Sequence, residues 1–246
     1  MLFLRSLLFF CLQSITVILF ALLAILVLPF PFKFRYQVIS QWAVLNLWLV
    51  DKICGVKYQV EGLDNIPDQA CVIMCKHESA WETLALQALF PIQVWVLKRE
   101  LLWIPFFGWG LAALNPIAID RSAGRQALSQ VVEQGTERLS SGNWVVIFPE
   151  GTRMPTGQMG RFGIGGARLA VDSGYPIVPV AHNAGTLWPK KGFIKYPGVI
   201  TVIIGEMIST QDKSATAVNK QTLQWMEQQM LQLNNRQNIV QENSQK

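Results

Sequence analysis

Residues 72–83 read VIMCKHESAWET, an apolar run followed by a short polar segment and the start of a helical pattern. The run Val72–Cys75 is typical of a strand buried on both faces, as in a parallel sheet. Ser79 followed three residues later by Glu82 forms a capping box, which predicts a helix that begins after Ser79. The segment therefore predicts a strand, a turn and a helix, with His77 at the carboxyl end of the strand.

The same alternation continues from about Val56 onward. Short apolar runs separated by helical segments predict an α/β domain with a mixed, largely parallel sheet flanked by helices. A helix is predicted at Ser122–Ser140, with Gly142 as its stop. Further strands are predicted at Val94–Leu97, Trp144–Phe148, Ile177–Val180 and Val199–Ile204.

The composition indicates partial residence in a membrane. Hydrophobic residues make up 51% of the chain and charged residues 15%. This is more apolar than an ordinary cytosolic domain and more mixed than a multi-span transporter. A net charge of +5 with nine tryptophans predicts a basic, aromatic-rimmed surface that lies against anionic lipid headgroups. No basic run is long enough to follow a phosphate backbone, so no nucleic acid partner is predicted.

Residues 1–55 are predicted to form a two-helix membrane anchor. Residues 7–28 are apolar apart from three polar side chains, so a helix there can cross a hydrocarbon core of ~30 Å or lie in one leaflet. A cleaved signal peptide is disfavoured, because the apolar run is long and residues 29–31 form a poor cleavage site. The basic Lys33 and Arg35 precede a second apolar stretch at Val38–Val50. These charges favour the cytoplasmic side for the domain that follows, and the membrane is expected to be a bacterial-type inner membrane.

Two further regions follow the anchor. Residues 56–233 are predicted to form the catalytic domain, and the Asn/Gln-rich residues 234–246 are predicted to be a disordered tail. Helical spacing marks a docking helix at the end of the domain, carried by Leu223, Met226, Met230 and Leu233.

His77 and Glu82 form a candidate catalytic pair. A neutral imidazole takes a proton from an alcohol near neutral pH, and a carboxylate on its far nitrogen fixes the tautomer. Residues five apart lie about 140° apart on a continuous helix, so His77 must precede the helix for the two to meet. Alternatively, Glu82 serves only as the capping residue of that helix. The two roles are expected to compete for one carboxylate.

A second candidate site is Phe148–Arg153, which reads FPEGTR after an apolar strand. A type I turn with proline at its second position is one reading of this segment. That turn does not require Glu150 or Arg153, whose side chains suit a glycerol hydroxyl and a phosphate. Lys98 and Arg121, each placed just after an apolar run, are the other candidate anion-binding residues.

Other polar residues carry weaker signals. Cys71, Cys75 and His77 can lie together on a strand, but a structural zinc needs a fourth ligand, so no metal site is predicted. The cysteines are interpreted as buried thiols. His182, the second histidine, is interpreted as a loop or structural residue.

With these blocks in this order, the sequence resembles the PlsC-type glycerolipid acyltransferase family, that of the 1-acyl-sn-glycerol-3-phosphate acyltransferases. The likeness covers most of the chain, and FPEGTR at 148–153 is its most specific motif. The family's HxxxxD block is seen as His77 to Glu82. The remaining blocks are matched by Lys98-Arg99-Glu100-Leu101 with Pro105 and Gly108, by Ile119-Asp120-Arg121, by the Gly-rich residues 161–166 and by Ile177-Val178-Pro179-Val180.

Two positions depart from the family pattern. Glu82 replaces the usual aspartate, which lengthens the carboxylate arm by one methylene. Gly163 stands where family members often carry a lysine, which removes one anion contact and leaves more of the phosphate binding to Lys98, Arg121 and Arg153.

The resemblance implies acyl transfer from acyl-CoA or acyl carrier protein to the sn-2 hydroxyl of lysophosphatidate, without a bound cofactor or metal. His77 is then the base and Glu82 its orienting group. Residues 101–109 line the acyl path, rest on the membrane or pack in the core. The substrate-binding residues are Lys98, Arg121, Glu150, Gly151, Thr152 and Arg153. Another lyso-lipid or glycerol-3-phosphate as acceptor, and a non-catalytic lipid-binding protein, are the alternatives.

Overall fold

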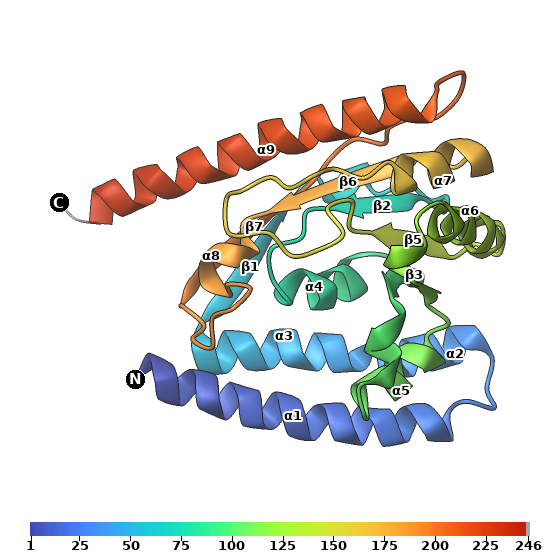
Figure 1. Cartoon of the computed structure of the whole chain (residues 1–246). Coiled ribbons are helices and arrows are strands. Elements are labelled where there is room, and N and C mark those ends of the chain that lie inside the picture. Colours follow the sequence, from blue (N-terminus) through green and yellow to red (C-terminus); the bar gives the residue numbers. More distant parts are fainter. Residues whose placement is uncertain (245–246) are drawn as a thin grey trace.

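The computed structural model describes residues 1–244 and shows a seven-stranded sheet between two layers of helices (Figure 1). The strands are β1 Val56–Glu61, β2 Val72–Cys75, β3 Gln93–Lys98, β4 Ile117–Ile119, β5 Trp144–Ile147, β6 Ile177–His182 and β7 Gly198–Ile204. They lie in the order β1-β7-β6-β2-β5-β3-β4. The strand that precedes His77 therefore lies at the centre, paired parallel with β5 and β6.

Among the neighbouring strands of the described chain, β6 and β7 alone are antiparallel, so β1 and β7 run against the other five. This is the mixed, largely parallel sheet that the sequence predicts, and the prediction is confirmed. The five predicted strands are β2, β3, β5, β6 and β7. β1 and β4 were not predicted from apolar runs because they are the two edge strands. β4 has three residues, and β1 is largely exposed.

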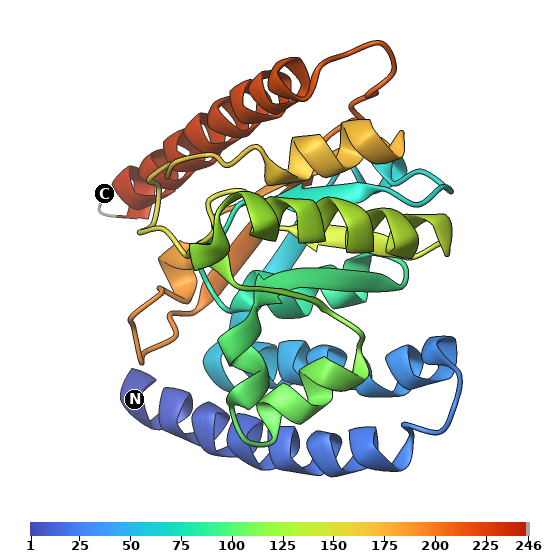
Figure 2. The same ribbon diagram turned by 45° about the vertical axis from the view of Figure 1, so that its right-hand side comes forward.

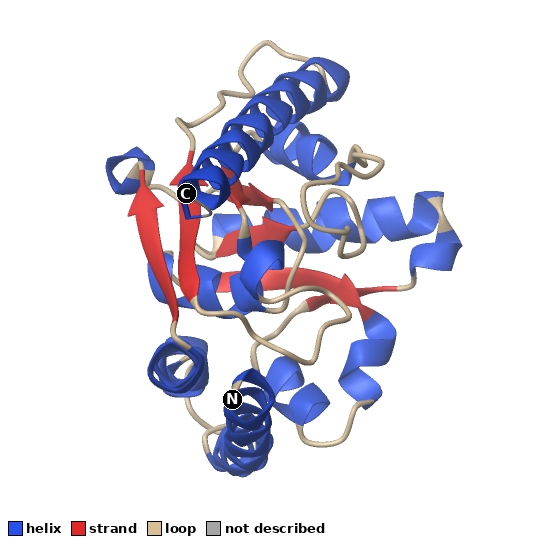
Figure 3. Ribbon diagram, turned by 90° about the vertical axis from the view of Figure 1, so that its left-hand side faces the viewer, coloured by secondary structure: helices blue, strands red, loops and turns tan. Residues whose placement is uncertain are grey.

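Helices cover both faces of the sheet (Figures 2 and 3). They are α1 Leu2–Leu26, α2 Phe32–Ile39, α3 Gln41–Cys54, α4 Trp81–Leu89, α5 Phe107–Ala113, α6 Arg125–Ser140, α7 Gly165–Ser173, α8 Ala184–Leu187 and α9 Ala215–Ser244. On one face α4 packs on the sheet, α3 on α4 and α1 on α3, whereas α6, α7 and α9 cover the other. Side chains of β2 alternate between the layers: Ile73 and Cys75 face α4, and Val72 and Met74 face α6 and α7.

The predicted amino-terminal pair of helices consists of three helices in the structure. α1 runs along the outside of the molecule, and the chain returns beside it through α2 and α3, which meet at Ser40 (Figure 1). The helical segment therefore begins at Phe32, six residues before the predicted second stretch. α1 is long and apolar enough to cross a membrane. Its outer face exposes a stripe of large apolar side chains: Leu4, Leu8, Ile15, Leu19, Leu22 and Leu26.

α9 docks on the sheet through three of the four predicted positions, whereas Leu223 is half-buried outside this cluster. Met226, Met230 and Leu233 are buried against Ala181 and Ile203. The prediction of a disordered tail was wrong for residues 234–244, which continue α9, and residues 245–246 lie outside the described chain. The tail contains no glycine or proline to end the helix, and glutamine and glutamate are good helix formers. The boundaries between anchor, catalytic domain and tail stay predictions.

Candidate active site

His77 lies at the carboxyl end of β2, in the turn before α4, as the spacing to Glu82 requires. Its ring stacks on the ring of Phe148, with centroids 3.9 Å apart and planes inclined by 15°. Its Nδ1 lies 2.8 Å from Oε1 of Glu82. Its Nε2 has no hydrogen-bond partner in the described chain, and 15% of the side chain is exposed. Nε2 is therefore the ring nitrogen left for a substrate.

One oxygen of Glu82 holds both the imidazole and the start of α4. Oε1 accepts from Nδ1 of His77 and from the main-chain N–H groups of Glu78 and Ser79, at 3.0 and 2.9 Å. Burial raises the pKa of Glu82, but the charge that His182 and His77 carry when protonated, together with the hydrogen bonds from His77 and the Ser79 N–H, outweighs burial and holds that pKa below its ordinary value. Glu82 is thus a carboxylate that keeps the His77 proton on Nδ1. Capping and orienting share an oxygen, so the expected competition between them was wrong.

α4 starts one residue later than the capping box predicts. α4 begins at Trp81, and the hydroxyl oxygen of Ser79 accepts from the Trp81 N–H at 3.1 Å. The same hydroxyl donates to the carbonyl of Trp188 at 2.6 Å. The turn that carries His77 is therefore attached to the segment after β6 as well as to its own helix.

His182 is buried behind the His77–Glu82 pair, although the sequence assigns it no place in the site. It is the last residue of β6, and its Nε2 lies 2.9 Å from the Lys76 carbonyl oxygen and 3.9 Å from Oε2 of Glu82. Its Nδ1 accepts from the N–H of Ala184 at 3.2 Å. An Nδ1 that accepts and an Nε2 that donates to a carbonyl define a neutral ring with its proton on Nε2, and burial lowers the pKa of His182 in the same sense.

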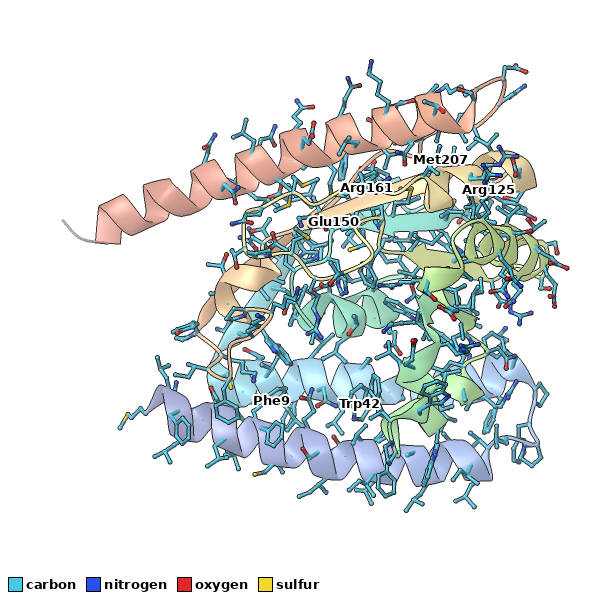
Figure 4. The ribbon with its side chains drawn as sticks, viewed as in Figure 1. Phe9, Trp42, Arg125, Glu150, Arg161 and Met207 are labelled. Atoms are coloured by element: carbon cyan, nitrogen blue, oxygen red, sulfur yellow. The ribbon has the colours of Figure 1, made fainter. Side chains whose placement is uncertain are left out.

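The FPEGTR segment forms the expected turn, closed by a hydrogen bond of 2.9 Å from Gly151 N–H to the Phe148 carbonyl oxygen. Gly151 has φ +67°, a conformation that glycine adopts without strain. Glu150 points into the interior, where 1% of its side chain is exposed (Figure 4). Its oxygens accept from Nζ of Lys76 and from the main-chain N–H groups of His77 and Gly160. Both carboxylate oxygens of Glu150 thus accept hydrogen bonds from the protein itself, and this overturns the assignment of Glu150 to the glycerol.

Lys76 and Glu78, which flank His77, are buried charged residues that the sequence did not assign to the site. Oε1 of Glu78 lies 3.8 Å from Nζ of Lys76 and accepts from the Gly157 N–H at 3.0 Å. Burial raises the pKa of Glu78 to about 7, against the opposing effect of the Lys76 charge. The sequence did contain a signal for their burial. Lys76 directly follows a wholly apolar strand and Glu78 comes two residues later, and such positions are buried when the strand is central in its sheet.

His77 opens on a cleft of about 280 Å³. Three cations line it together with His77, namely Lys98, Arg121 and Arg153, which are the predicted anion-binding residues. The remaining wall is mainly apolar. It comes from α1, α3, α4 and α5 and includes Val17, Phe20, Ala21, Trp42, Phe107, Gly110, Leu111 and Leu114.

Hydrogen bonds position two of the side chains that line the cleft, Trp42 and Arg121. Trp42 of α3 points toward α1, where its Nε1 donates to Oγ1 of Thr16 at 3.1 Å (Figure 4). Arg121 begins a short turn that Asp120 caps at the Ser122 N–H, at 2.9 Å. α6 consequently begins at Arg125, three residues later than predicted.

The two remaining predicted residues have different positions. Gly151 lies beside Arg121, since a Cβ at this position would be 3.8 Å from Nη1 of the guanidinium. Thr152 is exposed and does not line the cleft. The structure therefore brings together His77, Glu82, Lys98, Arg121, Gly151 and Arg153, and leaves out Glu150 and Thr152.

Cys75 at the end of β2 and Cys71 just before its start are buried thiols. Burial raises the pKa of Cys71 to about 12 and the pKa of Cys75 well above its ordinary value. In the described chain no three His, Cys, Asp or Glu side chains are grouped closely enough to hold a metal ion. Neither thiol is a candidate nucleophile or ligand at neutral pH.

Comparison with known proteins gives a consistent picture. The Acyltransferase family model matches residues 57–183. A 1-acyl-sn-glycerol-3-phosphate acyltransferase of Pseudomonas aeruginosa is 46% identical over 234 residues, which are 93% of this chain and 91% of that protein. One from Limnanthes douglasii is 31% identical over 82% of this chain and 72% of its own length. The crystal structure of the 1-acyl-sn-glycerophosphate acyltransferase PlsC from Thermotoga maritima matches with a TM-score of 0.79 and 21% identity, covering 94% of this chain and 95% of that one.

Proposed function

This chain belongs to the acyltransferase family, and from that premise we propose that it acylates the sn-2 hydroxyl of 1-acyl-sn-glycerol-3-phosphate to give phosphatidate. The observation that carries the proposal is the His77–Glu82 pair at a cleft that is lined by three cations and by a mainly apolar wall. A lipid with a phosphate headgroup matches that division. The acceptor named for the Pseudomonas and Limnanthes relatives is of this kind.

The reaction follows from the tautomer of His77. Its unprotonated Nε2 takes the proton of the acceptor hydroxyl, and the oxygen attacks the carbonyl carbon of a thioester of coenzyme A or acyl carrier protein. A tetrahedral oxyanion forms, the carbon–sulfur bond breaks, and the imidazolium returns its proton to the leaving thiolate. Glu82 stabilises the imidazolium throughout. Transfer is direct, because the Cys75 thiol is buried and protonated and no serine elbow motif is present in the sequence.

The acceptor phosphate binds at Lys98, Arg121 and Arg153 in this proposal. Gly163, which replaces the family's frequent lysine, donates its N–H to the Pro149 carbonyl at 2.8 Å and adds no charge. The three cations therefore supply the charge-assisted hydrogen bonds to the phosphate.

Arg121→Ala should raise KM for lysophosphatidate by about 10- to 100-fold, the usual effect of losing a hydrogen bond to a charged group, with a smaller change in kcat. Steady-state kinetics with varied acceptor measures this. The matched control is Arg168→Ala on α7, an exposed arginine paired with Asp172 at 2.6 Å, which should leave KM unchanged. An unchanged KM in the Arg121 variant would remove Arg121 from the phosphate site.

An acyl chain lies along the apolar wall formed by α1, α3 and α5. Gly110 on α5 lines this wall, and apart from its chain neighbours and the backbone of its own helix, no heavy atom of the described chain lies within 4 Å of the position that its Cβ would take. Gly110→Phe should therefore fill the cleft and lower kcat/KM for a sixteen-carbon donor by about tenfold relative to an eight-carbon donor. Ala112→Phe, on the exposed side of the same helix, is the control and should keep the chain-length profile. Equal profiles for both variants would place the acyl chain elsewhere.

The proposed location is the cytoplasmic face of a bacterial-type inner membrane. The apolar stripe on α1 supports this, as do Trp103 and Trp109, which are 68% and 44% exposed near the cleft. Tryptophan favours the membrane interface. Removing a lipid acceptor fully into water costs ~0.8 kcal/mol per CH₂, so a site at the bilayer surface saves that free energy.

Purified full-length protein given lysophosphatidate and acyl-CoA or acyl carrier protein thioester should release free thiol and form phosphatidate in equal amounts. The same assay with glycerol-3-phosphate and a lyso-ornithine lipid tests the acceptor. No turnover with either donor would leave a lipid-binding protein without catalysis as the better description.

A further inference from the structure

Lys76 is a lysine whose side chain is completely buried next to the proposed base. Its Nζ lies 2.9 Å from each oxygen of Glu150 and 3.8 Å from Oε1 of Glu78. Its own main chain is also held, because its N–H donates to the Val180 carbonyl and its carbonyl accepts from His182. Burying an ammonium group is costly unless ionic partners compensate, so such a lysine is expected only where it has a task.

The ion pair connects two segments that are 74 residues apart. Glu150 accepts from the main-chain N–H of His77 at 3.2 Å and from that of Gly160 at 2.8 Å. The carbonyl of His77 accepts from the Met154 N–H at 2.7 Å. The backbone of His77 is thus held on both sides by the loop that Lys76 anchors through Glu150.

We propose that Lys76 is a positioning residue for acyl transfer, whose buried ion pair with Glu150 sets the backbone of His77 and the loop that carries Arg153 relative to each other. The base and the phosphate-binding cation come from these two segments, so their relative placement decides whether the acceptor hydroxyl meets Nε2 of His77. Misplacement of reacting groups by about 1 Å costs about 100-fold in rate.

Lys76 is the cation that compensates the buried carboxylates next to His77. Three carboxylates are almost fully buried here, those of Glu78, Glu82 and Glu150. Glu82 is near His77 and His182, and within the described chain Lys76 is the only lysine or arginine that pairs with any of the three. Removing its charge leaves Glu78 and Glu150 as buried carboxylates without a cation. Glu150 then lacks the partner that directs its oxygens to His77 and Gly160.

The test compares Lys76→Met, Lys76→Arg and wild type in the phosphatidate assay. Because the inference rests on the proposed function, wild-type turnover is measured first, and its absence would count against acyl transfer rather than against Lys76. Lys76→Met should lower kcat by about 100-fold with KM for lysophosphatidate within about threefold of wild type. Lys76→Arg keeps a cation that can bond both oxygens of Glu150, so its kcat should be at least about tenfold higher than that of Lys76→Met.

The matched control is Lys195→Met, which removes another buried lysine. Lys195 lies among Phe9, Trp188 and Phe193 at the amino-terminal part of α1, and its loss should lower Tm without a comparable fall in kcat. If Lys76→Met fails to fold, the neutral pair Lys76→Met/Glu150→Gln replaces it, since that pair leaves no unpaired charge between the two positions. A folded Lys76→Met or neutral-pair variant with kcat within about threefold of wild type overturns the proposal, as does an arginine variant no better than methionine.

Discussion

Replacing His77 by alanine should lower kcat by about 1,000-fold, because general base catalysis contributes about 10²- to 10⁴-fold and no other described group can take the acceptor proton. His182 cannot replace it, because His182 is buried and its Nε2–H donates a hydrogen bond to the Lys76 carbonyl oxygen. Binding of lysophosphatidate should persist, since the cations and the apolar wall are unchanged. Phosphatidate formation measures kcat, and a direct binding assay measures the affinity.

Gln87→Ala is the control for His77→Ala. Gln87 lines the same cleft from α4, and its side chain bonds only the Thr83 carbonyl within the described chain, at 2.9 Å. Both variants should keep the wild-type Tm within a few degrees. Activity of His77→Ala within tenfold of wild type would exclude His77 as the base.

Glu82→Gln should lower kcat by about 100- to 1,000-fold while the protein stays folded. An amide oxygen can still accept from the N–H groups of Glu78 and Ser79, so the start of α4 keeps its cap. The negative charge that stabilises the His77 imidazolium is lost, and an amide does not enforce one tautomer. Glu82→Asp, the usual residue of the family, keeps the charge and should retain more activity than the glutamine variant. Unimpaired turnover by Glu82→Gln would make Glu82 a capping residue only.

The same substitution has a signature in stability against pH. The pKa of Glu82 in the folded protein lies below its ordinary value of 4.5. Its contribution to the free energy of unfolding is therefore present above about pH 4.5, and is lost as pH falls through the lower folded pKa. The difference in Tm between wild type and Glu82→Gln should accordingly shrink below pH 4.5. A difference that is constant from pH 7 to pH 3 would show that charge at Glu82 does not support the fold.

Local sequence was sufficient for the reactive pair. The strand at residues 72–75, the capping signal at Ser79 and the five-residue spacing to Glu82 place His77 before the helix, and the structure has it there. The cations were also found from their positions after apolar runs. Lys98 is the last residue of β3, and Arg121 comes shortly after β4. Such signals succeed because a strand end and a helix cap depend on neighbours within a few residues.

The assignment of Glu150 failed for the opposite reason. Its type suited a glycerol hydroxyl, but its orientation depends on Lys76, which is 74 residues away in the chain. His182 was set aside for the same reason, since the sequence does not show that β6 lies next to β2 and brings the ring behind Glu82. The helical continuation beyond Asn234 was missed because polar composition was read as disorder.

The sequence by itself determined the alternation of strands and helices, the pair His77 and Glu82, the FPEGTR turn and the resemblance to a family. Each is a matter of periodicity, spacing or local hydrogen bonding. Only the tertiary structure decided that Lys76 and Glu150 form a buried ion pair, and that α1, α3 and α5 close a cleft on His77. The physical reason is the order of strands in the sheet. Pairing β2 with both β5 and β6 brings side chains that are distant in the sequence into one desolvated space. In that space the role of a charged side chain depends on its hydrogen-bond and ionic partners more than on its residue type.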